Sequence, residues 1–286
     1  VKSHNMLGFD APYIPGWDCH GLPIELKVDR ELGPKKKQMS TADFRRACRA
    51  YAEKYVDIQR RDFKRLGILG TWDDPYKTLK FEYQAAIVRA LGKFVEQDMV
   101  YKGKKPVHWC THCPTALAEE EVEYEQHVSP SIYVEFPMKD GDASVLIWTT
   151  TPWTIPNNLA IAFHPDFEYG LYDVDGKNVI VAKELGNTIG EKIGKSFDKL
   201  LKTFPGKEMA RVVFRHPLYE RDSLGVLGDY VRPEAGTGAV HTAPGQGADD
   251  YKTGVKYGLE IYAPLDPGGH YNESVELFAG LKVWDA

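Results

Sequence analysis

The pattern of apolar and polar positions changes near residue 130. Before that point apolar residues recur at helical spacing, and after it short apolar runs alternate with turn residues, which is typical of strands. The predicted helices cover residues 22–33, 40–67, 81–96, about 183–193 and about 249–258. The predicted strands cover residues 131–137, 145–148, 212–214 and 239–241, with a hairpin over 167–182 that turns at Asp175 and Gly176. The chain is therefore expected to be α/β, with a strand-rich second part.

Two of the early helices carry an apolar stripe, and the stripe predicts which side chains face a core. The first stripe consists of Phe44, Cys48, Tyr51, Tyr55, Ile58 and Leu66, and the second of Ile87, Leu91 and Phe94. Ser40 and Asp43 predict a capped start for the longer helix. On this stripe Cys48 is expected to behave as a small hydrophobe rather than as a reactive thiol.

The buried strand at residues 145–148 ends in three consecutive threonines, Thr149, Thr150 and Thr151, and a fourth follows at Thr154. Threonine is stiff at χ1, and its hydroxyl both donates and accepts hydrogen bonds. The cluster therefore predicts an uncharged polar pocket, with an ordinary β-edge as the alternative.

A second polar loop follows at residues 236–251 and contains His241 and Asp250. Together the two loops supply the chemistry of a pocket. The alternatives are a core histidine bonded between strands and an aspartate that caps the next helix, although Asp249 can do the capping while Asp250 binds a ligand.

The turn before the first long helix presents Trp17, Asp18 and His20. A carboxylate in this place is suited to bind an ammonium group, and a histidine to polar contacts. The alternative is a capping aspartate and an internally satisfied histidine.

Cys110 and Cys113 form a Cys-x-x-Cys pair after a short strand, which is the spacing of a zinc knuckle. Four ligands are required, and His108 or His112 completes the set only with strained local geometry. A redox role is less favoured, because the motif does not open a helix. We expect structural zinc held here by half a site.

The length of 286 residues favours two domains, and 43% hydrophobic with 27% charged residues is globular. The sequence contains no apolar run long enough for a membrane span. Four scattered cysteines favour a reducing compartment and hence the cytoplasm. The first residues lack an initiator methionine and a signal-peptide pattern, so a fragment of a longer protein is expected.

The net charge of −5 is divided unevenly. Residues 1–128 carry 21 Lys and Arg against 19 Asp and Glu, and the remainder carries 15 against 22. Neither part is basic enough for an autonomous nucleic-acid binder, which disfavours a zinc-knuckle RNA-binding module.

With these motifs in view, the chain resembles the isoleucyl-tRNA synthetases, which are class I aminoacyl-tRNA synthetases. The resemblance rests on residues 15–25, on 108–119 around the cysteine pair, on 148–156 and on 236–245. Trp153 after Thr-Thr-Thr-Pro is similar to the isoleucyl rather than the valyl or leucyl relatives.

The resemblance implies a partial Rossmann-type catalytic domain over residues 1–128 and an editing domain, inserted as a connective peptide, over 129–286. Asp18 would bind the amino group of isoleucine, with Trp17 and His20 beside it. Cys110 and Cys113 would hold zinc, with further ligands beyond residue 286. The implied editing residues are Thr149, Thr150, Thr151, Thr154, Asn158, His241 and Asp250.

The resemblance also implies ATP as a substrate and isoleucine, tRNA(Ile) and misacylated Val-tRNA as partners, in a longer protein that we expect to be a monomer. The ATP-binding motifs His-x-Gly-His and Lys-Met-Ser-Lys-Ser do not occur in this sequence. This chain alone is therefore not expected to aminoacylate tRNA. A free-standing editing hydrolase is the alternative.

Editing is required because a pocket that accepts isoleucine cannot strongly reject the smaller valine. A second site must exclude isoleucine, bind the ammonium group and place donors around the ester. We expect His241 to exclude, Asp250 to bind and the threonines to donate. Water is the expected nucleophile, since no serine or cysteine nucleophile is evident.

Overall fold

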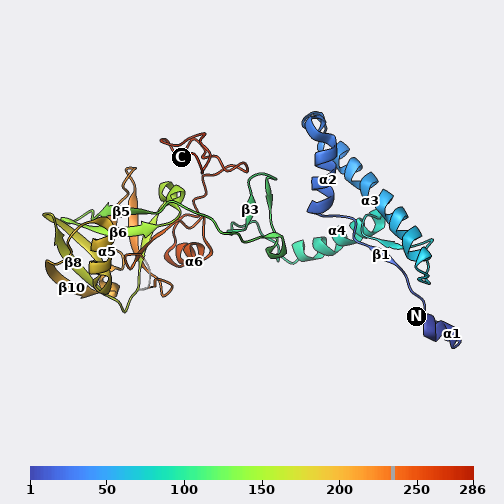
Figure 1. Ribbon diagram of the computed structural model, residues 1–286, viewed down its shortest axis with the longest axis horizontal. Helices are drawn as coiled ribbons and strands as arrows, with labels where there is room; N and C mark the ends of the chain where they lie inside the picture. The colour runs from blue at the N-terminus through green and yellow to red at the C-terminus, as the bar shows by residue number, and fades with distance from the viewer. Residues whose placement is uncertain (233–235) are drawn as a thin grey trace. The chain divides into compact units, whose positions relative to one another are not determined.

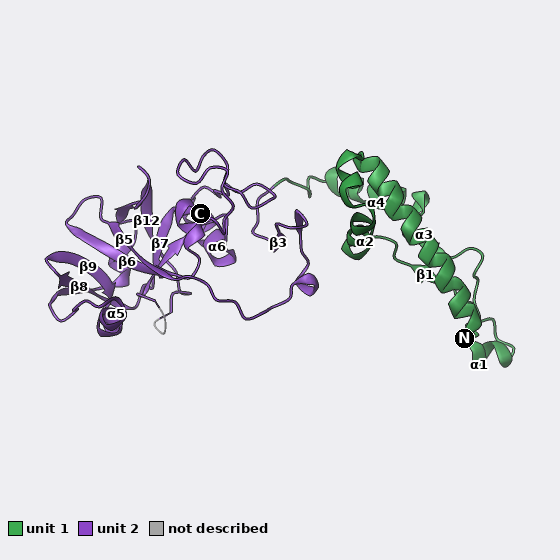
Figure 2. Cartoon of the chain, turned by 45° about the horizontal axis from the view of Figure 1, so that its top comes forward, with its two compact units in different colours: residues 1–102 green, residues 103–286 purple. Residues whose placement is uncertain are grey.

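The computed structural model of the protein describes residues 1–232 and 236–286. The described chain forms two compact units, Val1–Lys102 and Gly103–Ala286 (Figure 2). Helices dominate the first unit and strands the second (Figure 1). The predicted α/β class is therefore confirmed. The boundary at residue 128 between a catalytic and an editing domain stays a prediction.

The first unit consists of three long helices and one small parallel strand pair. Its elements are α1 (Lys2–Met6), β1 (Gly16–Trp17), α2 (Leu22–Leu32), the 3-10 helix η1 (Gly33–Gln38), α3 (Thr41–Arg65), β2 (Tyr76–Lys77) and α4 (Phe81–Val95). The Ser40 hydroxyl accepts a hydrogen bond from the Asp43 N–H at 3.1 Å, which confirms the predicted cap of α3. β1 pairs with β2 and so fixes the start of the turn that carries Asp18 and His20.

The apolar stripes of these helices are less buried than their spacing predicts. Ile87, Leu91 and Phe94 on α4 are each more than half exposed, at 53%, 54% and 54%. The prediction that they face a core is wrong for the described chain, because the buried cluster of this unit gathers elsewhere, around Cys19, Ala52, Val56 and Leu79.

In α3 the buried positions are Ala52 and Val56, which lie beside the predicted stripe. Leu66, which was expected to face inward, is exposed. Ile24 of α2 packs against the buried cluster that includes Ala52 and Val56. Cys48 is half-buried, and burial raises the pKa of its thiol, which fits a packing role.

The described part of the second unit contains two larger sheets. Its elements are β3 (Trp109–Cys110), β4 (Thr115–Ala116), η2 (Glu119–Glu121), β5 (Ile132–Pro137), β6 (Ala143–Thr149), η3 (Pro152–Asn157), β7 (Ala160–Phe163), β8 (Glu168–Val174), β9 (Lys177–Ala182), η4 (Lys183–Leu185), α5 (Gly186–Ile193), β10 (Leu200–Pro205), η5 (Gly206–Met209), β11 (Val213–Arg215), β12 (Asp222–Leu227), β13 (Ala239–Thr242) and α6 (Ala248–Tyr257). One sheet has the order β10-β8-β9-β6-β5, and the other β11-β12-β7-β13.

The predicted hairpin is confirmed, since β8 and β9 pair in antiparallel fashion around Asp175 and Gly176. Both turn residues have positive φ, at 53° and 81°, as a two-residue hairpin turn requires. The helices expected near residues 183–193 and 249–258 appear as η4 with α5 and as α6.

The core of this unit covers both faces of β6. Val145 and Ile147 pack into one buried cluster with Ile161 and Phe163 of β7, while Leu146 packs into a second cluster. A strand held on both faces has little freedom, so the position of Thr149 at its end is fixed.

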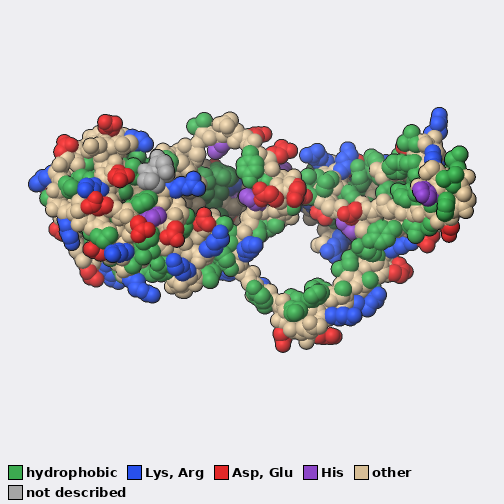
Figure 3. Space-filling model, turned by 90° about the horizontal axis from the view of Figure 1, so that it is seen from below, with side chains coloured by type: hydrophobic (Ala, Val, Ile, Leu, Met, Phe, Trp, Pro, Cys, Tyr) green, Lys and Arg blue, Asp and Glu red, His purple; other side chains and the backbone are tan. Residues whose placement is uncertain are grey.

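Among the helices of residues 1–232 and 236–286, none has both the length and the apolar character needed to cross a bilayer. Charged side chains of both signs are interspersed on the face shown in Figure 3.

Candidate functional site

The threonine loop forms where β6 ends and η3 begins. In a 3-10 helix residues three apart lie on one face, so Thr154 stands above the preceding Thr151. The Thr154 hydroxyl donates to the Thr151 carbonyl at 2.8 Å, and the hydroxyl oxygens of Thr149 and Thr151 lie 3.1 Å apart. The Thr151 N–H donates to Thr149 Oγ1 at 3.1 Å. The loop is therefore stabilised by its own hydroxyls.

His241 on β13 joins this loop to the second polar loop. Its Nε2 lies 2.7 Å from Thr154 Oγ1, across 87 residues of sequence. Its Nδ1 lies 3.4 Å from Asn158 Nδ2. The His241 side chain is 7% exposed, and burial lowers the pKa of its imidazole to about 4, with a smaller effect from nearby His216. His241 is therefore neutral near pH 7.

Asn158 follows η3 and is fully buried. Its Nδ2 donates to the Ala160 carbonyl at 2.8 Å, and its Oδ1 accepts from the Ser223 hydroxyl at 2.6 Å. Ser223 lies on β12 and was not predicted as a site residue, because the sequence around it matches no motif. The contact with Asn158 appears only once β12 pairs with β7.

Asp250 lies in the first turn of α6 and reaches back to the end of β13. Its Oδ2 accepts a hydrogen bond at 2.8 Å from the N–H of Ala243, two residues after His241. Burial raises the pKa of the Asp250 carboxyl to about 6, although the Ala243 N–H opposes this shift. Neighbouring Asp249 is exposed and pairs with Lys252 at 3.3 Å.

The threonines differ in their access to solvent. Thr149 and Thr154 are buried, and Thr151 is half-buried. Thr150 is exposed, and its carbonyl accepts a hydrogen bond from the Ser129 hydroxyl at 2.6 Å. The structure thus brings Thr149, Thr151, Thr154, Asn158 and His241 into one hydrogen-bonded network and leaves the Thr150 side chain at the surface beside it.

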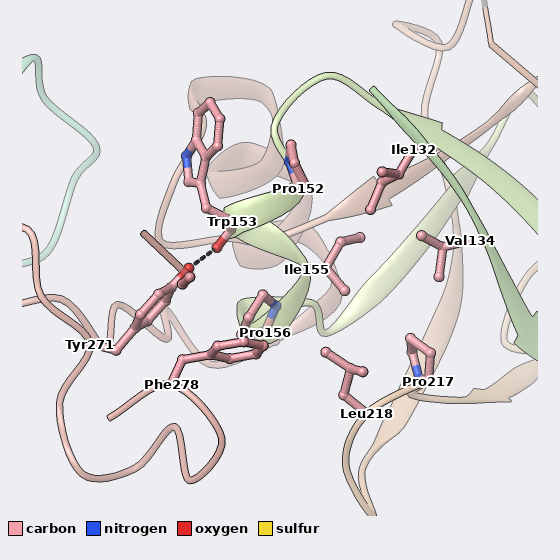
Figure 4. Close-up of a pocket in the computed structure, with 11 residues that line it drawn as sticks. Ile132, Val134, Pro152, Trp153, Ile155, Pro156, Pro217, Leu218, Tyr271 and Phe278 are labelled. Atoms are coloured by element: carbon pink, nitrogen blue, oxygen red, sulfur yellow. Dashed lines mark hydrogen bonds between the residues drawn. The ribbon is translucent and has the colours of Figure 1, made fainter. Parts of the chain in front are cut away.

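The other faces of η3 line an apolar cavity of about 240 Å³ (Figure 4). Its wall includes Ile132 and Val134 of β5, Pro152 and Trp153 of η3, and Phe278. This cavity is distinct from the polar network, because its lining residues are apolar or aromatic.

Three side chains bond the backbone of η3. The Tyr271 hydroxyl donates to the Trp153 carbonyl (Figure 4), and Arg221 donates to the Pro156 carbonyl. His216 Nε2 lies 2.8 Å from the Ile155 carbonyl, to which it must donate. Burial lowers the pKa of His216 to about 4. These contacts fix η3, which carries Thr154.

In the first unit the predicted residues gather on the turn between β1 and α2. Asp18 Oδ1 accepts from the Thr78 hydroxyl at 3.1 Å and from the His20 N–H at 3.3 Å. The Trp17 indole donates to Gln59 at 2.8 Å. Asp18 and His20 are exposed, and α2 begins at Leu22 as predicted.

Cys110 is the last residue of β3, and Cys113 lies on the turn between β3 and β4. The Cys113 N–H donates to Cys110 Sγ at 3.4 Å. Backbone N–H groups, that of Cys113 first, lower the pKa of the Cys110 thiol. Thiolate formation suits a metal ligand, but the described residues contain no cluster of three or more His, Cys, Asp or Glu that could hold an ion. A structural zinc ion bound by this pair stays a prediction.

The chain belongs to a family of class I aminoacyl-tRNA synthetases. Residues 1–253 match the family described as tRNA synthetases class I (I, L, M and V). Relatives that align over the whole chain are isoleucine--tRNA ligases, which confirms the resemblance found in the sequence. That of Nitratidesulfovibrio vulgaris (strain Miyazaki F) is 50% identical over 297 residues, covering 100% of this chain and 32% of the relative.

The isoleucine--tRNA ligase of Geobacillus kaustophilus is 50% identical over 292 residues and also covers 100% of this chain and 32% of the relative. The chain therefore spans about a third of the length of the curated relatives it matches. The P. knowlesi cytosolic leucyl-tRNA synthetase editing domain aligns with a TM-score of 0.35 and 14% identity, over 38% of this chain and 48% of that one. A TM-score this low does not establish a shared fold.

Proposed function

We propose that the chain is part of an isoleucine--tRNA ligase of the cytoplasm. Residues 1–128 belong to the catalytic domain of the longer protein, which activates isoleucine with ATP and charges tRNA(Ile). Residues 129–286 form an editing domain that hydrolyses Val-tRNA(Ile). Identity of about 50% to isoleucine--tRNA ligases over the whole chain supports the proposal. It does not extend to aminoacylation by this chain alone.

The editing roles divide among three kinds of group. His241 excludes the larger isoleucine side chain, and Asp250 attracts the ammonium group of the misacylated residue. The threonine loop, with Thr149, Thr150 and Thr151, presents hydroxyl donors to the ester and to the attacking water. The terminal ribose hydroxyl of the tRNA assists in placing that water.

The observation that carries this proposal is the 2.7 Å contact between Thr154 Oγ1 and His241 Nε2. It joins two loops that are distant in sequence and that both match the family. Asp250 is tied to the same strand end through the Ala243 N–H. With a pKa of about 6, its carboxyl is ionised at neutral pH, as binding of an ammonium group requires.

The test compares two neighbouring acids. Asp250→Ala removes the proposed ammonium partner, and we expect Val-tRNA(Ile) hydrolysis by the purified chain to fall at least about tenfold, since a charge-assisted contact contributes about 1.5 to 3 kcal/mol. Asp249→Ala is the matched control, because Asp249 is exposed and pairs with Lys252. Equal rates for both variants would contradict the assignment of Asp250.

For the synthetic site, Asp18 binds the amino group of isoleucine, with Trp17 and His20 beside it. Asp18 is exposed, and its Oδ1 is oriented by Thr78. A carboxylate held in place in this way can attract an ammonium group.

Cys110 and Cys113 supply two of the four ligands of a structural zinc ion, and hydrolysis does not use this metal. The N–H bond to Cys110 Sγ supports the assignment, because it favours the thiolate. In equilibrium dialysis this chain should bind zinc weakly. Stoichiometric zinc that survives dialysis would contradict a half site.

The alternative of a free-standing editing hydrolase is not favoured. The family match begins at residue 1 and includes the turn that carries Asp18. An independent hydrolase has no use for an amino-acid-binding turn of a synthetic site.

A further inference from the structure

Ser223 on β12 is fully buried and contacts the candidate editing site through Asn158. The hydroxyl donates to Asn158 Oδ1 at 2.6 Å, and both residues are fully buried. The amide of Asn158 has only one orientation that satisfies its surroundings. The Ala160 carbonyl, 2.8 Å away, is an acceptor and must face the NH₂ group, so Oδ1 must face Ser223.

This orientation determines how His241 is protonated. Asn158 Nδ2 lies 3.4 Å from His241 Nδ1, and an NH₂ group can only donate. Nδ1 must therefore accept, which leaves the proton of the neutral ring on Nε2. Burial keeps the ring neutral by lowering its pKa to about 4.

The protonated Nε2 then donates to Thr154. Thr154 Oγ1 lies 2.7 Å from Nε2 and accepts from it, because the Thr154 proton is directed to the Thr151 carbonyl at 2.8 Å. The chain of donors runs from Ser223 through Asn158 and His241 to Thr154. Thr149 and Thr151 lie outside this chain of donors. Their hydroxyl oxygens are 3.1 Å apart, and Thr151 Oγ1 lies 3.4 Å from Thr154 Oγ1, so a bound ester or water would compete with these contacts for the hydroxyl protons.

We infer that Ser223 is a positioning residue that holds His241 in its Nε2–H tautomer through Asn158. The inference rests on the proposed editing function for its consequence, but the tautomer itself is a property of the chain. Without Ser223, a buried amide oxygen has no donor, and Asn158 gains by rotating toward other partners. His241 Nδ1 then loses its donor and the ring adopts both tautomers.

The test is a graded series at one position, Ser223→Cys and Ser223→Ala, because a thiol is a weaker donor than a hydroxyl and a methyl group is none. ¹⁵N NMR of the His241 ring distinguishes protonated from unprotonated nitrogens. We expect one Nε2–H form in the wild-type chain, a small change in the Cys variant and mixed tautomers in the Ala variant. Val-tRNA(Ile) hydrolysis should fall in the same order, by about tenfold for Ala.

Thr237→Val is the matched control, because Thr237 is also buried and, among the residues that the structure describes, its hydroxyl bonds the backbone of Ala239. It should leave the His241 signals unchanged. An unaltered Nε2–H signal in folded Ser223→Ala overturns the inference, whether or not hydrolysis falls. A wild-type chain that shows the tautomer but does not hydrolyse Val-tRNA(Ile) contradicts the proposed function and leaves the positioning role intact.

Discussion

At the scale of single residues, Asp250 is a group whose burial opposes folding. Its carboxyl accepts a hydrogen bond from the Ala243 N–H, and burial raises its pKa to about 6 from 3.8. A partly buried acid with a raised pKa destabilises the folded state once it ionises. Groups of this kind often lie at functional sites, where a ligand supplies the missing opposite charge.

Asp250→Asn should therefore stabilise the chain in a pH-dependent way. The unfolded carboxyl ionises above about 3.8 and the folded one only above about 6, so the cost of Asp250 appears between these values and is complete at pH 8. Urea unfolding should show a gain for the variant at pH 8 that disappears at pH 3.5. A gain of equal size at both pH values would mean that ionisation is not its cause. Asp249→Asn, which is exposed, should change stability little at either pH.

At the scale of elements, the sequence predicted those whose pattern is local. The capped start of α3, the hairpin turn at Asp175 and the run that forms β6 depend on neighbouring residues alone. β7 was missed because Ala160, Ile161, Ala162 and Phe163 are all buried, so the strand has no alternation to detect. The exposed stripe of α4 shows a second limit of prediction from sequence. Periodicity indicates that a helix has an apolar face, but it does not indicate which element covers that face.

A close approach between elements can be tested at two glycines with similar backbone angles. Gly238 has φ of +78°, and an added Cβ would lie 2.3 Å from the Ala182 Cβ. Gly176 has φ of +81° and no described heavy atom within 4 Å of such a Cβ. Gly176→Ala should lower the free energy of unfolding by about 1 kcal/mol from backbone strain alone.

Gly238→Ala adds a steric overlap to the same strain and should lose about 1 to 3 kcal/mol more. Chemical denaturation of the two variants measures the difference. Equal losses would show that β13 and the end of β9 tolerate separation. That result would weaken the view that packing fixes His241.

At the scale of the whole molecule, much of the site followed from motifs and much did not. The family motifs predict His241, Asp250 and the threonines as site residues, but the partners that orient them come from distant strands. No local sequence motif indicates the role of Ser223 on β12. The same holds for the three side chains that bond the backbone of η3, which are His216, Arg221 and Tyr271. Their roles depend on strand pairing across the sheets, which the residue pattern alone does not specify.

The two buried histidines predict how the second unit responds to acid. His216 and His241 have pKa values lowered to about 4, whereas an unfolded histidine titrates near 6.5. The unfolded state therefore binds more protons between these values, and stability is lost as pH falls from 6.5 to 4. The raised pKa of Asp250 has the opposite effect, so this group gains stability as pH falls. It is a single group, however, whereas two histidines lose stability.

The slope of unfolding free energy against pH, measured by urea denaturation, should be positive in this window. His216→Gln keeps a donor for the Ile155 carbonyl and removes one titrating group, so it should flatten the slope. An unchanged slope would show that His216 does not remain neutral in the folded chain.

The most direct test of the editing account is hydrolysis of Ile-tRNA(Ile) by His241→Ala. The wild-type chain should hydrolyse Val-tRNA(Ile) and spare Ile-tRNA(Ile), because we propose that the His241 ring occupies the space that the additional methylene of isoleucine requires. The variant should hydrolyse both. If it still hydrolyses Val-tRNA(Ile) and continues to spare Ile-tRNA(Ile), His241 does not exclude isoleucine and the account is contradicted.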